Sequence, residues 1–279
     1  MFFGVFVDED NKEMFLDGID SATLESADVW IGLVKEETDT ACGVMGAESL
    51  YDKRNKLALA IRYVKVAEDY NEQEVVTEML RFLCDIAADL KCSTVSFTKE
   101  VAEEGEDKTV ELLSKIGFFT EDKKYPKYGF KVSDITVWDL ESDTGSLTLN
   151  RLSDDQWKEF VEETKEYSFE VTKPSDYDGN LSVFLTDGRK DVQGGMLLSN
   201  REDKLFVDGI AAYGRDEEAL LNDLVYWGRE GAKKKYSADT EVDIILPAEK
   251  TYQNTLMKVT GNKAARVAKL MRFTYDVPV

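Results

Sequence analysis

The chain of 279 residues carries 35 Lys and Arg against 56 Asp and Glu, a formal net charge of -21. This charge repels phosphate polymers and anionic membrane surfaces, so it argues against nucleic-acid binding and favours a small cationic amine or a basic protein as partner. With 43% hydrophobic residues, the chain can bury a core in each of two domains of ordinary size.

No stretch approaches the ~18 consecutive apolar residues of a membrane span, and the apolar run at 2–7 has no basic flank, so we expect a cytoplasmic protein without membrane contact. Cys42, Cys84 and Cys92 follow no disulfide or metal spacing, and the chain has no histidine. We therefore expect three small buried thiols, no bound metal, and neither Ser-His-Asp nor Cys-His catalysis.

The first half of the chain alternates between strand and helix patterns. In chain order, the expected elements are a strand at 2–7, a helix near 10–19, strands at 29–34, 41–47 and 57–64, a helix over 76–90, a strand at 93–98, a short helix at 110–116 and a strand at 128–132. The strand at 57–64 is apolar enough to be buried on both faces. The acidic run 103–107 is expected to be a solvated loop, and Gly117 to end the short helix.

The same order recurs in the second half, which predicts an internal repeat. The expected elements are a strand at 146–152, a helix opened by a Ser153–Gln156 capping box, strands at 181–185, 192–198 and 204–212, a helix over 220–231, a strand at 241–246 and a short helix closing on Gly261. The acidic segment 139–145 suits a linker. We therefore predict two α/β domains, 1–140 and 145–279, each with a mixed, partly antiparallel sheet flanked by helices.

This order of elements resembles that of the GNAT (GCN5-related) acetyltransferases, here in tandem. In the first domain the resemblance rests on Val66-Ala67-Glu68-Asp69-Tyr70, which is similar to the family's strand end and turn before the cofactor helix, and on Leu112-Leu113-Ser114-Lys115-Ile116-Gly117-Phe118, which is similar to its short helix and Gly-Phe ending. The resemblance implies acetyl-CoA as cofactor and acetyl transfer to an amine.

In that family, a turn with the pattern Gln or Arg, two residues, Gly, one residue, Gly or Ala holds the cofactor diphosphate through its backbone amides. By position, the resemblance implies cofactor contacts at Val66, Asn71, Glu72, Gln73, Glu74, Val75, Val76 and Thr77. Asn71, Glu74 and Val76 all depart from the pattern. The matching segment 212–220 of the second domain lacks the glycine pair. The tyrosine that often serves as the general acid in this family corresponds to Leu113 in the first domain and Met257 in the second.

A helix N-terminus binds anions because its first N–H groups lack partners and the helix dipole is positive there. If Asn71 caps the helix and Glu74 folds back as in a capping box, the protein supplies its own anion. Glu68, Asp69 and Glu72 add negative charge. The segment is then either a modified cofactor loop that works when its carboxylates swing out, or an ordinary acidic helix start. In the second domain, only Gly214 and Arg215 favour a phosphate.

Amine acetylation needs a base, and three side chains are candidates for catalysis. Asp208 interrupts an apolar run, and its pKa would rise if it is buried; alternatively it occupies an exposed position of the strand. Glu68 ends the third strand and is either a base acting through water or a solvated turn residue. Tyr213, like Tyr70, follows a strand and either donates a proton or packs.

Three functional hypotheses follow. The chain is an acetyl-CoA-dependent N-acetyltransferase acting on a cationic amine, or a non-catalytic binding or scaffold protein that has lost the cofactor. The third hypothesis places an unrelated small ligand in the cleft between the two copies. The sequence leaves enzymatic activity undecided between them.

Overall fold

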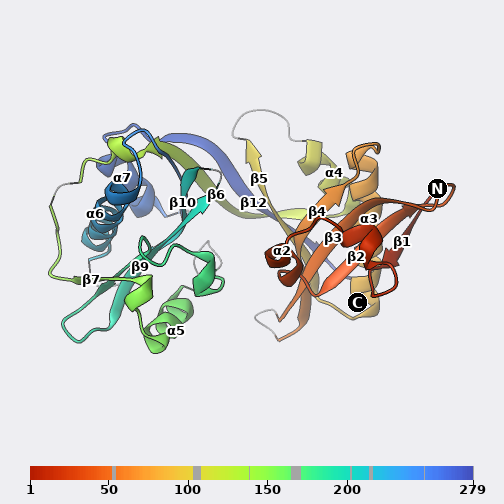
Figure 1. The fold of residues 1–279 in the computed structure, drawn as a ribbon, viewed down its shortest axis with the longest axis horizontal. Helices are drawn as coiled ribbons and strands as arrows, with labels where there is room; N and C mark the ends of the chain where they lie inside the picture. Colours follow the sequence, from red (N-terminus) through yellow and green to blue (C-terminus); the bar gives the residue numbers. More distant parts are fainter. Residues whose placement is uncertain are drawn as a thin grey trace. The chain divides into compact units, whose positions relative to one another are not determined.

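The computed structural model describes residues 1–51, 55–102, 108–137, 139–164, 171–201, 203–213, 216–247 and 249–278. They form two compact units (Figure 1). Unit 1 consists of Met1–Glu100, Glu104–Asp122 and Met271–Val279, and unit 2 of Val101–Glu103 and Lys123–Leu270. The predicted α/β class with mixed sheets flanked by helices is confirmed. The predicted division of the chain into domains 1–140 and 145–279 stays a prediction. In the structure, residues 271–279 belong to unit 1.

The elements of unit 1 are β1 Phe2–Phe6, α1 Lys12–Leu16, α2 Ser21–Glu25, β2 Val29–Lys35, β3 Thr40–Tyr51, β4 Leu57–Val66, α3 Glu72–Asp89, β5 Thr94–Ala102, α4 Lys108–Ile116, the start of β6 Phe119–Lys131 and the end of β12 Ala265–Asp276. The strand order is β1-β2-β3-β4-β5-β12. Strands β1 to β4 pair antiparallel, whereas β4 and β5 are parallel.

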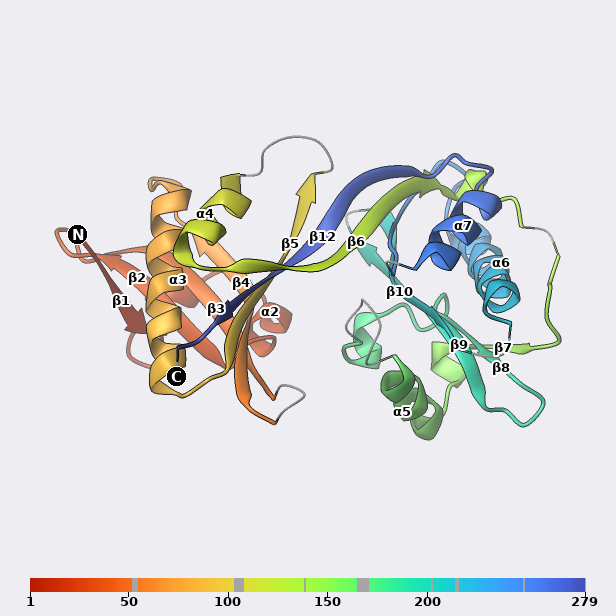
Figure 2. The same ribbon diagram turned by 180° about the vertical axis from the view of Figure 1, so that it is seen from behind.

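Helices cover both faces of the unit 1 sheet. The apolar stripe of α3, including Met79 and Leu83, is buried on strands β1 to β4, which the helix crosses (Figure 2). A Cβ at Gly32 of β2 would overlap the ring of Phe15 from α1. A Cβ at Gly43 of β3, which pairs with Leu33, would meet Val75 of α3. Because successive strand residues point to opposite faces, these contacts place α1 and α3 on opposite faces of the sheet.

The elements of unit 2 are the rest of β6 and β12, β7 Gly145–Thr148, α5 Asp154–Glu163, β8 Val183–Thr186, β9 Val192–Arg201, β10 Lys204–Ala212, α6 Glu217–Lys235, β11 Glu241–Ile245 and α7 Lys250–Val259. The strand order is β12-β6-β11-β10-β9-β8-β7, in which β10 and β11 are parallel. Strand β9 shows the two cores of this unit. Its Met196 and Leu198 belong to the core under α6 and α7, and Leu197 to the core with Phe160 of α5.

Several local predictions are confirmed. Asn71 caps α3, Ser153 and Gln156 form the capping box of α5, and Gly117 and Gly261 follow α4 and α7 with positive φ angles of 103° and 57°. All three cysteines are free and buried, and burial raises the pKa of Cys84 to about 12.

Within the described residues, no helix is both long and apolar enough to cross a bilayer.

Other boundaries were wrong. The helix expected near 10–19 is only the single turn of α1, and α2 follows it. The strand expected over 146–152 ends at Thr148 and continues as a 3-10 turn, Leu149–Arg151. Strand β12 was not predicted. The expected acidic loop at 103–107 lies outside the described residues.

Candidate functional site

In each unit, two neighbouring parallel strands are connected by a long helix, α3 between β4 and β5 and α6 between β10 and β11. The two strands of each pair are hydrogen-bonded over a short stretch only. In unit 1 the pairing of β4 with β5 is confined to Leu59–Ile61 and Val95–Phe97, although β4 continues to Val66. In unit 2 the pairing of β10 with β11 is confined to Leu205–Val207 and Val242–Ile244. Open α/β sheets bind ligands at the carboxyl ends of such strands, so we take the β4–β5 junction and the β10–β11 junction as the candidate sites.

The helix start at the β4–β5 junction is capped by its own side chain. Asn71 Oδ1 accepts a hydrogen bond from the backbone N–H of Glu74 at 3.2 Å. Glu72, Gln73 and Glu74 are exposed, and within the described residues the Glu74 carboxylate makes no return bond to the Asn71 N–H. The reciprocal half of the expected capping box is therefore missing, and two carboxylates remain in the first turn.

The other predicted cofactor positions divide between packing and helix bonding. Val75 is fully buried and packs on Gly43, whereas Val66 and Val76 are half-buried. Thr77 turns its hydroxyl back to the carbonyl of Gln73 at 2.5 Å. These residues therefore lie together at one helix start, but several of them pack in the core or form hydrogen bonds within the helix.

The turn before α3 is held by the neighbouring strand. The Ala67 N–H donates to the Cys42 carbonyl at 2.9 Å, and the Tyr70 hydroxyl lies 2.9 Å from Thr40 Oγ1. The Tyr70 ring also packs edge-on against Phe2. Glu68 lies exposed in this turn. Tyr70 thus joins the turn to β1 through its ring and to β3 through its hydroxyl.

Asp208 lies at the end of the β10–β11 pairing. It is the extra residue of a β-bulge, since Val207 pairs with Leu198 and Gly209 with Leu197. Its side chain is 14% exposed and bonds the Arg201 guanidinium. Burial raises the pKa of Asp208 above the usual 3.8, and Arg201 opposes the shift. Its Oδ2 atom is buried without a hydrogen-bond partner among the described residues. The site therefore holds a largely buried carboxylate beside the Ser199 hydroxyl and the Arg201 guanidinium, both of which lower its pKa.

Two further charges at this junction escaped the sequence analysis. Lys127 of β6 pairs with Asp243 of β11 at 3.1 Å, and both side chains are nearly buried. The Phe206 ring has Lys127 Nζ 5.3 Å from its centroid and Arg201 Cζ at 5.1 Å. Only the interruption of apolar strands by charges hinted at these residues. They make the surroundings of Asp208 a partly buried, mixed-charge cluster.

The helix start at the β10–β11 junction is also self-capped. Asp216 Oδ1 accepts from the Ala219 N–H at 3.2 Å, and Glu217 and Glu218 follow in the first turn. Glu218 is partly neutralised by Lys258 of α7, whose Nζ lies 3.4 Å from it. Gly214 and Arg215, the two residues expected to favour a phosphate, lie outside the described residues.

Tyrosines of unit 2 fill the space at the end of β10. The Tyr252 hydroxyl, on α7, accepts the Ala212 N–H at 3.1 Å, and Tyr252 is 3% exposed. Tyr213 is half-buried against the core that contains Phe160. At the positions of the family's acidic tyrosine, Leu113 is fully buried and Met257 packs on the unit 2 core. Sequence matching by position missed Tyr252, which precedes Met257 by five residues in α7 and reaches the junction.

Among the described residues, which leave out Gly214 and Arg215, the donors at these junctions do not fit the diphosphate of CoA. In both helices a side-chain oxygen already takes a first-turn N–H, and carboxylates surround the remaining donors. At Ala212 a tyrosine hydroxyl takes the strand-end N–H as well. Among the described residues, no group of three or more Cys, Asp or Glu side chains is placed to hold a metal ion.

Comparison with solved structures identifies the fold. A tandem GNAT protein from the clavulanic acid biosynthesis pathway is 8% identical, with a TM-score of 0.69 over 100% of this chain and 99% of that chain. A putative acetyltransferase from Pyrococcus horikoshii is 15% identical, with a TM-score of 0.60 over 100% and 90%. A glucosamine N-acetyltransferase region of a fungal multi-domain β-N-acetylglucosaminidase is 8% identical (TM-score 0.69), and the match covers 99% of this chain and 38% of that one.

No protein-family model and no curated protein sequence matches the chain. At these identities the structural similarity establishes the fold alone. The chain therefore has the tandem GNAT fold, as the order of its elements predicted.

Proposed function

We propose that this chain is a non-catalytic binding protein that uses the tandem GNAT fold without a CoA diphosphate site. The observation that carries the proposal is the same replacement in both units: an Asn71 or Asp216 oxygen takes a first-turn N–H of the helix, at 3.2 Å in each case. At both junctions a side chain of the protein thus occupies one first-turn donor that could otherwise bind an anion.

The energies favour exclusion of a diphosphate. A helix start typically stabilises an anion by ~0.3–2 kcal/mol. One like-charge pair ~5 Å apart costs up to about 3 kcal/mol at an effective dielectric of ~20, before solvent and salt reduce it. Glu72 and Glu74 are exposed, so each repels less than this limit. Together they still offset what the helix start provides.

A titration tests the proposal. Calorimetry with CoA and acetyl-CoA should give no dissociation constant below ~1 mM for the wild type. Removing the two charges with Glu72→Gln/Glu74→Gln should strengthen binding about tenfold, because ~1.4 kcal/mol of repulsion is lost. The exposed pair Glu36→Gln/Glu37→Gln changes the net charge equally and should leave affinity unchanged. A wild-type dissociation constant below ~100 μM contradicts the proposal.

A second candidate function is acetyl transfer to a cationic amine in unit 2, and Asp208 favours it. A partly buried carboxylate with a raised pKa suits a general base, and the net charge of -21 attracts cationic acceptors. Under this alternative, the wild type binds acetyl-CoA and releases thiol in the presence of spermidine, and Asp208→Asn abolishes the release. Absence of thiol release with spermidine and with basic peptides leaves the binding role as the function.

A further inference from the structure

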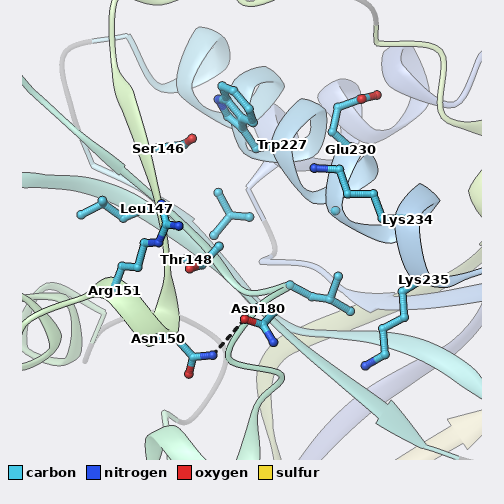
Figure 3. A pocket seen from close by; sticks show the side chains of 13 residues that line it. Ser146, Leu147, Thr148, Asn150, Arg151, Asn180, Trp227, Glu230, Lys234 and Lys235 are labelled. Carbon is cyan, nitrogen blue, oxygen red and sulfur yellow. Dashed lines mark hydrogen bonds between the residues drawn. The ribbon is translucent and has the colours of Figure 1, made fainter.

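Unit 2 has a pocket far from the start of α6. Its volume is about 500 Å³, within the range of small-molecule sites. It lies between the second half of α6, from Trp227 to Lys235, and the β7–β8 edge (Figure 3). Since an α-helix rises 1.5 Å per residue, Trp227 is about 15 Å along the axis from the first residue of α6. The pocket is therefore separate from the β10–β11 junction.

The pocket gathers positive charge in an acidic chain. Arg151, Lys234 and Lys235 line it, with Glu230 as the acidic residue. Glu230 is already paired with Arg229 and Lys233, each at 3.1 Å. Lys235 pairs with Asp178 at 2.5 Å.

Arg151 and Lys234 remain without a counter-charge. Neither makes an ion pair with any residue in the described part of the chain, and both are exposed. Figure 3 shows the Lys234 side chain extending toward Trp227, and the Glu230 carboxylate pointing away from it. The free charge of the pocket is thus positive.

The pocket also has an aromatic wall. Trp227 is half-buried, and its Nε1 atom is buried without a hydrogen-bond partner among the described residues. Leu147, Leu181 and Val183 supply apolar surface beside it. Because the Nε1 atom is buried, a ligand in the pocket contacts the apolar ring of Trp227 rather than this donor.

We propose that this pocket binds a small organic carboxylate with a planar apolar body. Arg151 and Lys234 hold the carboxylate through charge-assisted hydrogen bonds, and the apolar body packs on Trp227 and Leu181. This inference goes beyond the proposed function, because it concerns a separate site and does not depend on whether CoA binds.

Phenylacetate is the probe, read through the indole N–H signals of the four tryptophans in a ¹H–¹⁵N spectrum. Trp227→Phe identifies the Trp227 signal. That signal should shift on titration with a dissociation constant below about 1 mM, and Arg151→Gln/Lys234→Gln should weaken binding at least about tenfold. Phenylacetamide, which lacks the charge, should bind at least about tenfold more weakly, and inorganic phosphate should compete poorly because it lacks the apolar body.

The matched control is Lys158→Gln/Lys250→Gln, which removes two exposed cations of unit 2 outside the pocket and should bind like the wild type. Three outcomes overturn the proposal: no movement of the Trp227 signal at 10 mM phenylacetate (about ten times the expected constant), equal affinity for phenylacetamide, or equal weakening in the control. The CoA titration of Arg151→Gln/Lys234→Gln should match that of the wild type, so failure here is distinguishable from failure of the proposed function.

Discussion

Asp223 of α6 is a fully buried carboxylate that holds the segment entering unit 2's β7. It accepts hydrogen bonds from the Glu141 N–H at 2.7 Å, the Ser142 N–H at 3.0 Å and the Ser142 hydroxyl. The adjacent Asn222 donates to the Asp139 carbonyl at 3.2 Å. The segment predicted from its composition to be a linker is thus anchored along one side of a helix.

Replacing this carboxylate should destabilise unit 2. Asp223→Ala leaves two backbone donors and one hydroxyl without their acceptor, and we expect a loss of about 2–4 kcal/mol in the free energy of unfolding. Urea denaturation followed by tryptophan fluorescence measures it. Asp143→Ala, an exposed position of the same segment, should change the stability by less than about 0.5 kcal/mol. Equal effects of the two substitutions would show that the bonds to Asp223 are not stabilising.

Asp208 should give the stability a measurable pH dependence. Because burial raises its pKa above 3.8 in the folded state, the native protein binds more protons than the unfolded chain between the two pKa values. The free energy of unfolding attributable to Asp208 therefore falls as the pH rises through that window. Asp208→Asn should remove this slope in thermal melts between about pH 3.5 and 7. The exposed Asp191→Asn should keep it, and identical slopes in all three proteins would refute the assignment.

At the scale of elements, sequence reasoning succeeded where a signal is local. The oxygens of Asn71 and Ser153 cap the next turn of their own helices, so a few residues suffice to predict the cap. It failed where partners are distant. Lys127 and Asp243 are 116 positions apart in the sequence, and only the antiparallel pairing of β6 with β11 brings them together. The Glu74 carboxylate also stayed exposed although its spacing suited a capping box.

Among the elements, we expect removal of the end of strand β12 to have the largest effect on stability. Its end belongs to unit 1, where Phe273 is fully buried, Tyr275 packs on Phe118 with centroids 5.5 Å apart, and the Val277 N–H donates to Ser93 at 3.1 Å. Ending the chain after Leu270 removes several buried side chains, each worth about 1.5–3 kcal/mol.

We expect this truncation to unfold unit 1 while α6 in unit 2 keeps its hydrogen-exchange protection. A control that ends after Val277 keeps the buried residues and should protect α3 like the full chain. A synthetic peptide of residues 265–279 added to the truncated protein should restore protection of α3. If α3 is equally protected without residues 271–279, these residues do not complete the core of unit 1.

At the scale of the whole molecule, the tandem fold was predictable because the order of strands and helices repeats, and this order needs no motif identity. The functional assignment was less predictable, because it depends on charges that meet only in three dimensions. The pocket shows this most clearly: Arg151 follows β7, whereas Lys234 lies in the last turn of α6, and nothing in the sequence connects them. A net charge of -21 also gave no indication of a pocket with free positive charge.

Because residues 271–279 belong to unit 1, this unit can be completed on the ribosome only after unit 2 has been translated. Residues 1–122 emerge first, but the last strand segment of their unit follows only after residues 123–270 have been translated. At 5–20 residues per second this delay is roughly 7–30 s. During that interval the nascent unit 1 presents an unfilled edge beside β5, a target for chaperones or for the same segment of a neighbouring nascent chain.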